Sequence, residues 1–110
     1  MDLENSRAQM KKGILEYCIL AILEKGDAYA SDIIQRLKES NLVVVEGTLY
    51  PLLTRLKNDT LLTYRWEEST MGPPRKYYKL TPEGNNFLQE LHKIWRDFVD
   101  TVEQIVKPIK

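Results

Sequence analysis

The chain has 110 residues, which is enough for one hydrophobic core. Its formal net charge of zero argues neither for nor against a nucleic-acid partner. Hydrophobic residues make up 43% of the sequence and charged residues 29%, as in ordinary globular proteins. No run of about 18 apolar residues could span a bilayer, so we expect no membrane segment and one compact domain with at most one added element.

The N-terminal sequence MDLENSRAQMKKG carries mixed charge and lacks the basic start and apolar core of a secretory signal. The chain has one cysteine, Cys18, which cannot form an internal disulfide. Cys18 falls within an apolar stripe and is interpreted as a small core residue. The lack of a secretory signal and the single cysteine together lead us to expect a cytoplasmic protein.

Two helices are predicted in the first 40 residues. Apolar residues recur at helical spacing over residues 14–23, so the first helix is expected from about Asn5 to Glu24, with a stop at Gly26. The following segment, ASDIIQRLKES, has one apolar side and is predicted to form a second, short helix. Ser31 lies near its start, where a side-chain oxygen can accept a hydrogen bond from a free backbone N–H.

The segment EGTLYPLLTRLKNDTLL, residues 46–62, is predicted to contain a third helix. It should begin at Gly47 or Thr48, because Pro51 is tolerated only near a helix start, where its missing N–H costs little. The three valines before it, residues 43–45, could form a short strand. One side of the helix is apolar and consists of Leu49, Leu52, Leu53 and Leu56.

The other side of this third helix is small and polar. Pro51 and Thr54 lie opposite the leucines, flanked by Tyr50 and Arg55. Thr48 and Tyr50 lie in the first turn, where hydroxyls and free N–H groups can bind a phosphate, and a proline ring or a threonine methyl can contact a thymine methyl. From its spacing alone, the same surface could simply face solvent.

A positively charged β-hairpin is predicted after the third helix. LLTYRWEEST has the alternation of a strand, MGPP breaks it, and RKYYKLT forms a second strand rich in tyrosine. Residues 47–80 carry six basic and three acidic side chains, whereas residues 1–46 carry six and eight and residues 81–110 carry four and five. The positive charge is therefore concentrated in the third helix and the hairpin.

A long C-terminal helix is predicted to start at Thr81-Pro82, with the threonine as its N-cap and the proline at its first position. Its apolar residues recur in steps of three and four and form a stripe that no later element could cover, so the stripe should pack against a partner surface. The predicted dimer interface consists of Phe87, Leu88, Leu91, Ile94, Trp95, Phe98, Val102 and Ile105.

Three helices, a basic hairpin and a long helix are the order of a winged helix-turn-helix protein, in which the third helix enters the major groove of DNA. The predicted fold class is mainly α with a small β-hairpin: a winged helix-turn-helix plus a long C-terminal dimerisation helix. We assign residues 1–80 to the DNA-binding domain, with the N-terminal helix also contributing to dimerisation, and residues 81–110 to the dimerisation helix.

Two motifs give the chain a specific resemblance. GTLYPLLTRL followed by PPRKYYKLTPEG resembles the signature of the PadR family of bacterial transcriptional regulators, and the resemblance covers nearly the whole chain. It implies a winged helix protein that dimerises through its C-terminal helix, binds a two-fold related site on double-stranded DNA and usually acts as a repressor. The DNA-binding residues expected from the motifs and the helix surface are Tyr29, Ser31, Thr48, Tyr50, Pro51, Thr54, Arg55, Arg75 and Lys76.

The sequence departs from the family pattern after the third helix. Glycine is common at that position, but this chain has NDTLL, so Asn58 or Asp59 should adopt the left-handed conformation that ends the helix. The chain is similar to compact, drug-binding members in which a tryptophan faces its symmetry mate across a central pore. Trp95, in HKIWRDF, matches by position, so we hold a small hydrophobic effector site as a hypothesis, with packing in the dimer interface as the alternative.

Enzyme chemistry is not indicated, because the sequence has no Ser/His/Asp or Cys/His set, no phosphate-binding glycine loop and no metal cluster. No cofactor is expected, and His92 is interpreted as a surface histidine rather than a metal ligand. Trp66 is interpreted as a packing aromatic at the base of the hairpin. The rival hypothesis is a protein-interaction module, in which the long helix pairs with a different chain and the hairpin is only solvated.

Overall fold

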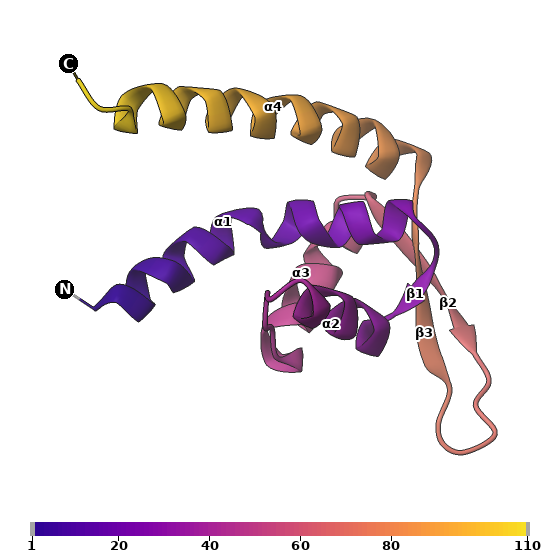
Figure 1. Cartoon of the computed structure of the whole chain (residues 1–110). Helices are drawn as coiled ribbons and strands as arrows, with labels where there is room; N and C mark the ends of the chain where they lie inside the picture. Colours follow the sequence, from indigo (N-terminus) through magenta and orange to yellow (C-terminus); the bar gives the residue numbers. More distant parts are fainter. Residues whose placement is uncertain (1, 110) are drawn as a thin grey trace.

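The computed structural model describes residues 2–109; residues 1 and 110, the outer limits of the two assigned domains, lie outside the described residues. Within that range, four helices and a small antiparallel sheet form the fold (Figure 1), and the mainly α winged helix class is confirmed. The elements are α1 (Leu3–Glu24), β1 (Ala28–Tyr29), α2 (Ala30–Glu39), α3 (Glu46–Asn58), β2 (Leu62–Glu67), β3 (Arg75–Leu80) and α4 (Pro82–Val106).

The expected two-stranded hairpin is part of a three-stranded sheet with strand order β1-β3-β2. The additional strand, β1, has two residues, and its Tyr29 pairs with Tyr77 of β3. Two residues are too few to show the period-two alternation by which a strand is predicted from sequence. The pairing fixes the N-terminal end of α2 beside the hairpin.

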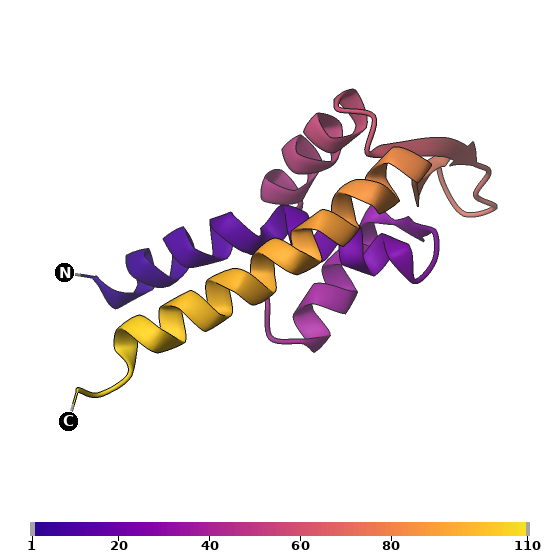
Figure 2. The same cartoon turned by 90° about the horizontal axis from the view of Figure 1, so that it is seen from above.

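The hydrophobic core lies where the second half of α1 meets α2, α3 and the first turns of α4. The predicted leucine side of α3 is confirmed, because Leu49, Leu53 and Leu56 are buried and Leu52 packs against them. Figures 1 and 2 show α1 and α4 side by side with opposite chain directions, and both extend past the core as two arms. The largest fully buried side chains are Leu15, Ile19, Leu20, Ile33, Leu49, Leu53, Leu56, Leu62 and Leu88.

The start of α3 differs from the prediction. The helix begins at Glu46, because the carbonyl of Val45 accepts the N–H of Thr48 at 3.0 Å and closes the first turn. Val45 is therefore the N-cap of the helix, and residues 43–45 form no strand. Pro51 lies in the second helical turn, where its missing N–H leaves the carbonyl of Gly47 without its usual intrahelical donor.

The end of α3 also differs from the prediction, because the left-handed residue is Thr60, with φ of 64°, and not Asn58 or Asp59. Asp59 is the C-cap, so the left-handed position falls one residue later. The N–H of Thr60 donates to the carbonyl of Lys57, and that of Leu61 donates to the carbonyl of Leu56, each at 3.0 Å. This pair of hydrogen bonds is a Schellman motif formed without glycine.

The first turn of α4 is attached to the residues that end α3. Thr81, the predicted N-cap, accepts the N–H of Gly84 at 2.9 Å and donates its hydroxyl to the carbonyl of Thr60 at 2.6 Å. The N–H of Thr81 donates to the carbonyl of Leu61 at 3.1 Å. Gly84 is buried against this junction, and a Cβ atom there would collide with the Leu61 carbonyl oxygen and lie 2.8 Å from Leu80 Cδ1.

Gly84→Ala should therefore destabilise the fold by about 1–3 kcal/mol, because backbone atoms must shift to admit the methyl group. The matched control is Gly13→Ala in α1, where nothing lies within 4 Å of the added Cβ. That substitution should stabilise the helix by about 0.5–1 kcal/mol. Urea unfolding at one protein concentration measures both; the same sign of change for the two variants would contradict a close-packed junction.

Candidate nucleic-acid interface

The outer side of α3 carries the predicted recognition residues. Thr48, Tyr50, Pro51 and Thr54 are all exposed, opposite the buried leucines of the same helix. Arg55 is placed differently, since its guanidinium forms an ion pair with Glu16 of α1. Its charge is therefore compensated on the side of α3 that faces α1. Thr48 lines a pocket with residues of α1 on that same side, whereas Tyr50, Pro51 and Thr54 are directed away from the core.

The hairpin formed by β2 and β3, which we call the wing, carries Arg75 and Lys76 next to each other on β3. Successive residues of a strand point to opposite faces, so these two cations leave the wing on different sides. Arg75 lies over the ring of Tyr29, with its Cζ 3.9 Å from the ring centre, and Lys76 Nζ lies 4.6 Å from the centre of Tyr64. Among the described residues, neither cation is in an ion pair with a carboxylate.

Arg65, the third cation of the wing, is compensated by carboxylates. Its Nε donates to Glu67 Oε1 at 2.6 Å, and its Nη1 lies 3.5 Å from Asp27 Oδ2. The hydrogen bond to Glu67 raises the pKa of Arg65 above its ordinary value. Arg65 Cζ also lies 4.6 Å from the ring centre of Tyr77, so the three cations that lie over rings differ in their acidic partners: Arg65 has two, whereas Arg75 and Lys76 have none among the described residues. The fourth cation of the wing, Lys79, has neither kind of partner among those residues.

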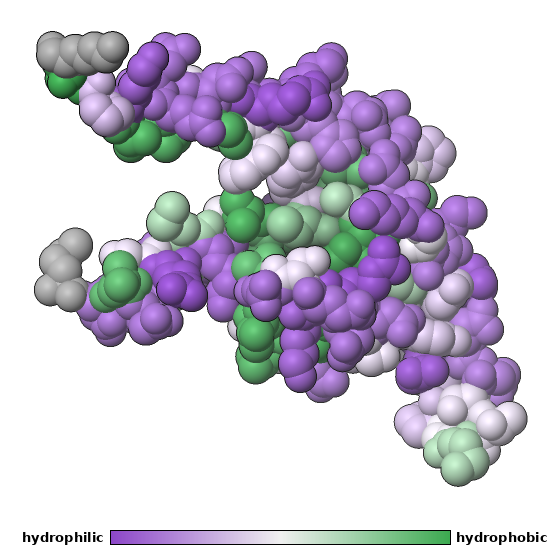
Figure 3. Space-filling model, viewed as in Figure 1, coloured by the Kyte–Doolittle hydropathy of each residue, from purple (hydrophilic) through white to green (hydrophobic). Residues whose placement is uncertain are grey.

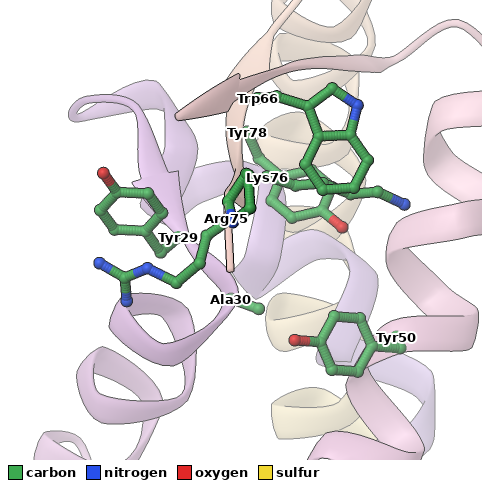
Figure 4. Close-up of a pocket in the computed structure, with 8 residues that line it drawn as sticks. Tyr29, Ala30, Tyr50, Trp66, Arg75, Lys76 and Tyr78 are labelled. Carbon is green, nitrogen blue, oxygen red and sulfur yellow. The ribbon is translucent and has the colours of Figure 1, made fainter. Parts of the chain in front are cut away.

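A groove separates the outer side of α3 from the wing. Its larger pocket has a volume of about 250 Å³, and Figure 4 shows Tyr50 of α3 across it from Trp66 and Lys76 of the sheet. A second pocket of about 100 Å³ continues the groove along α3, past Thr54 and Lys57. The residues that line both pockets are Lys76 and Tyr78.

Tyr78 forms the floor of this groove and was not predicted as a site residue. It is buried, and its burial raises the pKa of the phenol, with smaller contributions from Tyr50 and Tyr64. The hydroxyl therefore stays protonated and neutral. The alternation of RKYYKL could have placed Tyr78 on the face of Lys76, but only the packing of α3 over that face shows that it reaches a groove.

The N-terminal end of α2 completes one side of the groove. Tyr29 is the N-cap of this helix, its N–H donates to Asp32 Oδ2 at 3.0 Å, and its ring lies against the wing. Ser31 is exposed in the first helical turn. Of the predicted DNA-binding residues, Tyr29, Tyr50, Arg75 and Lys76 therefore line one pocket, Thr54 lines its continuation, and Arg55 is directed to α1.

The apolar stripe of α4 is mostly uncovered. Exposed side chains gather on the side of α4 that faces the opening between the two arms (Figure 3), and they are Phe87, Ile94, Trp95, Phe98, Val102 and Ile105. Leu88 was wrongly expected among them; it is fully buried, because the first turns of α4 pack into the chain's own core. Leu91 is half-buried against the same core.

Trp95 and His92 both lie near Tyr17 of α1. Trp95 is 43% exposed, and its ring centre lies 6.2 Å from that of Tyr17. The Tyr17 hydroxyl is 2.6 Å from His92 Nδ1, and His92 Nε2 is 3.8 Å from Glu24 Oε1. The interpretation of His92 as a surface histidine was therefore incomplete, since the residue is half-buried and contacts Tyr17 of α1.

Metal binding and membrane insertion are two further properties that the described residues could indicate. Residues 2–109 contain no group of three or more His, Cys, Asp or Glu side chains arranged to hold a metal ion. None of the helices in that range is long and apolar enough to cross a membrane.

A three-stranded sheet with a cationic wing, next to a helix whose outer side is polar and exposed, defines a winged helix protein. A family model described as the transcriptional regulator PadR-like family matches residues 19–90, which is more than half of the chain. The chain therefore belongs to the PadR-like family of transcriptional regulators, as its two motifs indicated.

Solved structures and a named relative agree with this assignment. A PadR-like transcription factor from Bacteroides fragilis is 65% identical, covers 93% of this chain and 99% of its own, and has a TM-score of 0.79. The structure of Bacillus subtilis PadR in complex with operator DNA is 28% identical with a TM-score of 0.66, over 71% of this chain and 45% of its own. The transcriptional regulator YqjI of Escherichia coli is 31% identical over 98 residues, which are 86% of this chain and 44% of YqjI.

Proposed function

We propose that this regulator is a cytoplasmic, homodimeric repressor that binds an operator with two-fold symmetry. The observation that carries the proposal is the groove between α3 and the wing, which combines an exposed polar helix surface with two cations that have no carboxylate partner. In this arrangement α3 lies in the major groove and the wing binds the neighbouring backbone. The operator complex of Bacillus subtilis PadR, a relative with the same fold, supports DNA as the ligand.

The two sides of the groove perform different tasks in this proposal. Pro51 and Thr54 are short side chains that allow a close approach to the bases, and the longer Tyr50 projects far enough to reach them. Contacts with base edges and thymine methyl groups discriminate between DNA sequences. Arg75 and Lys76 contact phosphates, which all sequences share. Specificity then comes mainly from α3, and sequence-independent affinity comes mainly from the wing.

A second copy of the chain is the partner proposed for the α4 stripe. Six large apolar side chains of α4 are exposed on the side that faces the opening between the arms, where burial against an identical surface would remove them from water. Residues 81–110 then serve dimerisation, with help from α1, and residues 1–80 serve DNA binding. The proposal requires that a two-fold axis through the stripe bring the two α3 helices about one DNA turn apart, roughly 34 Å.

For α3, Thr54→Ala should weaken binding to the preferred operator by about 1–3 kcal/mol and change binding to random-sequence DNA much less. Two conservative variants separate the groups of the side chain. Thr54→Val keeps a methyl group and Thr54→Ser keeps the hydroxyl, so the variant that retains affinity identifies the contact. Fluorescence anisotropy with both duplexes gives the two affinities, and equal losses on both would remove the recognition role from Thr54.

For α4, Phe98→Glu should convert the dimer into a monomer, because a carboxylate would be buried in an apolar interface. Arg96→Glu places the same side chain on the opposite side of the helix and is the matched control. Sedimentation velocity of the purified chain checks both variants and also tests the rival protein-interaction module. A wild-type chain that sediments as a monomer at micromolar concentration would favour pairing with a different protein.

The effector hypothesis rests on Trp95, whose half-exposed ring lies on the stripe next to Tyr17. A flat hydrophobic dye bound between two copies should quench its fluorescence and lower the affinity for the operator. Trp95→Ala should abolish the quenching while the protein remains a dimer. The chain has one other tryptophan, Trp66, on the wing, so quenching that persists in Trp95→Ala would place the dye elsewhere.

A further inference from the structure

We propose that Arg75 is kept available for DNA by two positioning residues, Tyr29 and Arg65. The ring of Tyr29 orders the guanidinium without neutralising it, and Arg65 occupies Glu67, the carboxylate directly opposite Arg75 on the neighbouring strand. This inference rests on the proposed DNA-binding function of the wing. It concerns residues that act through Arg75 and do not themselves need to touch DNA.

The register of the sheet makes Glu67 the expected partner of Arg75. The two residues are directly opposite each other on β2 and β3, and cross-strand pairs of opposite charge attract. The Glu67 carboxylate nevertheless accepts the Nε–H of Arg65, two residues away on its own strand. Asp27, the other carboxylate near this face, also lies beside Arg65. Arg65 thus pairs with the residue opposite Arg75 and with Asp27.

Tyr29 holds the guanidinium that Arg65 leaves unpaired. Its backbone is fixed by the β1–β3 pairing with Tyr77 and by the hydrogen bond of its N–H to Asp32. Its ring packs edge to face on Tyr77, with ring centres 4.7 Å apart, so the ring cannot turn freely under Arg75. Arg75 Cζ, 3.9 Å from the ring centre, lies within the range of a cation–π contact.

The difference between the two kinds of partner matters for phosphate binding. A carboxylate partner would also order the arginine. When DNA binds, however, either this ion pair breaks or the carboxylate stays and repels the phosphate, and both cost binding free energy. An aromatic face orders the planar guanidinium and leaves the N–H groups at its edge free to donate. The ring therefore reduces the side-chain entropy that Arg75 loses on binding DNA, and it leaves the charge of Arg75 unneutralised.

The other face of the wing has the same arrangement. Lys76 lies opposite Trp66 in the sheet, and its Nζ is 4.6 Å from the Tyr64 ring centre and 5.5 Å from the Trp66 ring centre. Arg75 and Lys76 thus both rest on rings without an acidic partner among the described residues, whereas Arg65, which also lies over a ring, pairs with Glu67 and Asp27. This pattern on both faces distinguishes a built arrangement from a single chance contact.

The test measures the affinity of the full chain for a random-sequence duplex as a function of salt. Arg75→Ala should weaken binding and reduce the slope of log K against log salt by about one. Tyr29→Leu should weaken binding about two- to fivefold, the amount of an exposed cation–π contact, and Tyr29→Phe should retain the affinity because the ring remains. In the Arg75→Ala background, Tyr29→Leu should have no further effect.

Arg65 provides an independent variant that leaves β1 unchanged. Arg65→Leu should weaken DNA binding because Glu67 becomes free to pair with Arg75, and adding Glu67→Gln should restore it. A loss that the second substitution does not restore would mean that Arg65 contacts DNA itself, which overturns its positioning role. Thermal unfolding of each variant shows that the fold is retained.

The outcomes separate this inference from the proposed function. If Arg75→Ala changes neither affinity nor slope, the wing does not bind phosphate and the proposed function of the wing fails. A second outcome is that Arg75→Ala weakens binding but Tyr29→Phe loses as much DNA affinity as Tyr29→Leu. In that case the Tyr29 hydroxyl and not its ring contributes to binding, so the inference fails while the proposed DNA-binding function stands. Additive losses for Tyr29→Leu and Arg75→Ala would overturn it in the same way.

Discussion

The arrangement of the molecule depends on two backbone carbonyl groups, those of Thr60 and Leu61. They belong to the left-handed residue that ends α3 and to the residue after it, and they accept the hydroxyl and the N–H of Thr81, the N-cap of α4. Gly84 lies so close to the Leu61 carbonyl that no side chain fits between them. The helix proposed to read DNA and the helix proposed to form the dimer are thus joined directly, and the wing lies between them in sequence.

The charge of this protein acts locally. A net charge of zero would not identify a nucleic-acid-binding surface, yet Arg75 and Lys76 beside the α3 groove have no acidic partner among the described residues, and Glu67 of the wing is paired with Arg65. Arg55 shows the opposite case, since its ion pair with Glu16 contributes to the contact of α3 with α1. Whether a basic residue of this protein is available to bind DNA therefore depends less on its type than on the neighbour with which it is paired.

Much of the fold could be predicted because its strongest signals are local. The leucines of α3 and the threonine–proline start of α4 show helical periodicity and capping that depend on neighbours in sequence. The missed features depend on distant contacts: β1 exists only because β3 lies beside it, and Tyr78 reaches a groove only because α3 packs near it. The left-handed residue, Thr60, was predicted one or two residues too early because the pattern alone does not show which residue is the cap.

Leu88 changes the meaning of the division between a DNA-binding part and a dimerisation part. The side chain belongs to α4 but fills the core formed by the first three helices, together with the buried Gly84. A fragment that ended at residue 80 would lack both residues and would expose a hole of leucine size in its centre. The two parts are therefore separate tasks of one cooperative unit, and loosening of α4 at the interface would also lower the stability of the domain that carries α3.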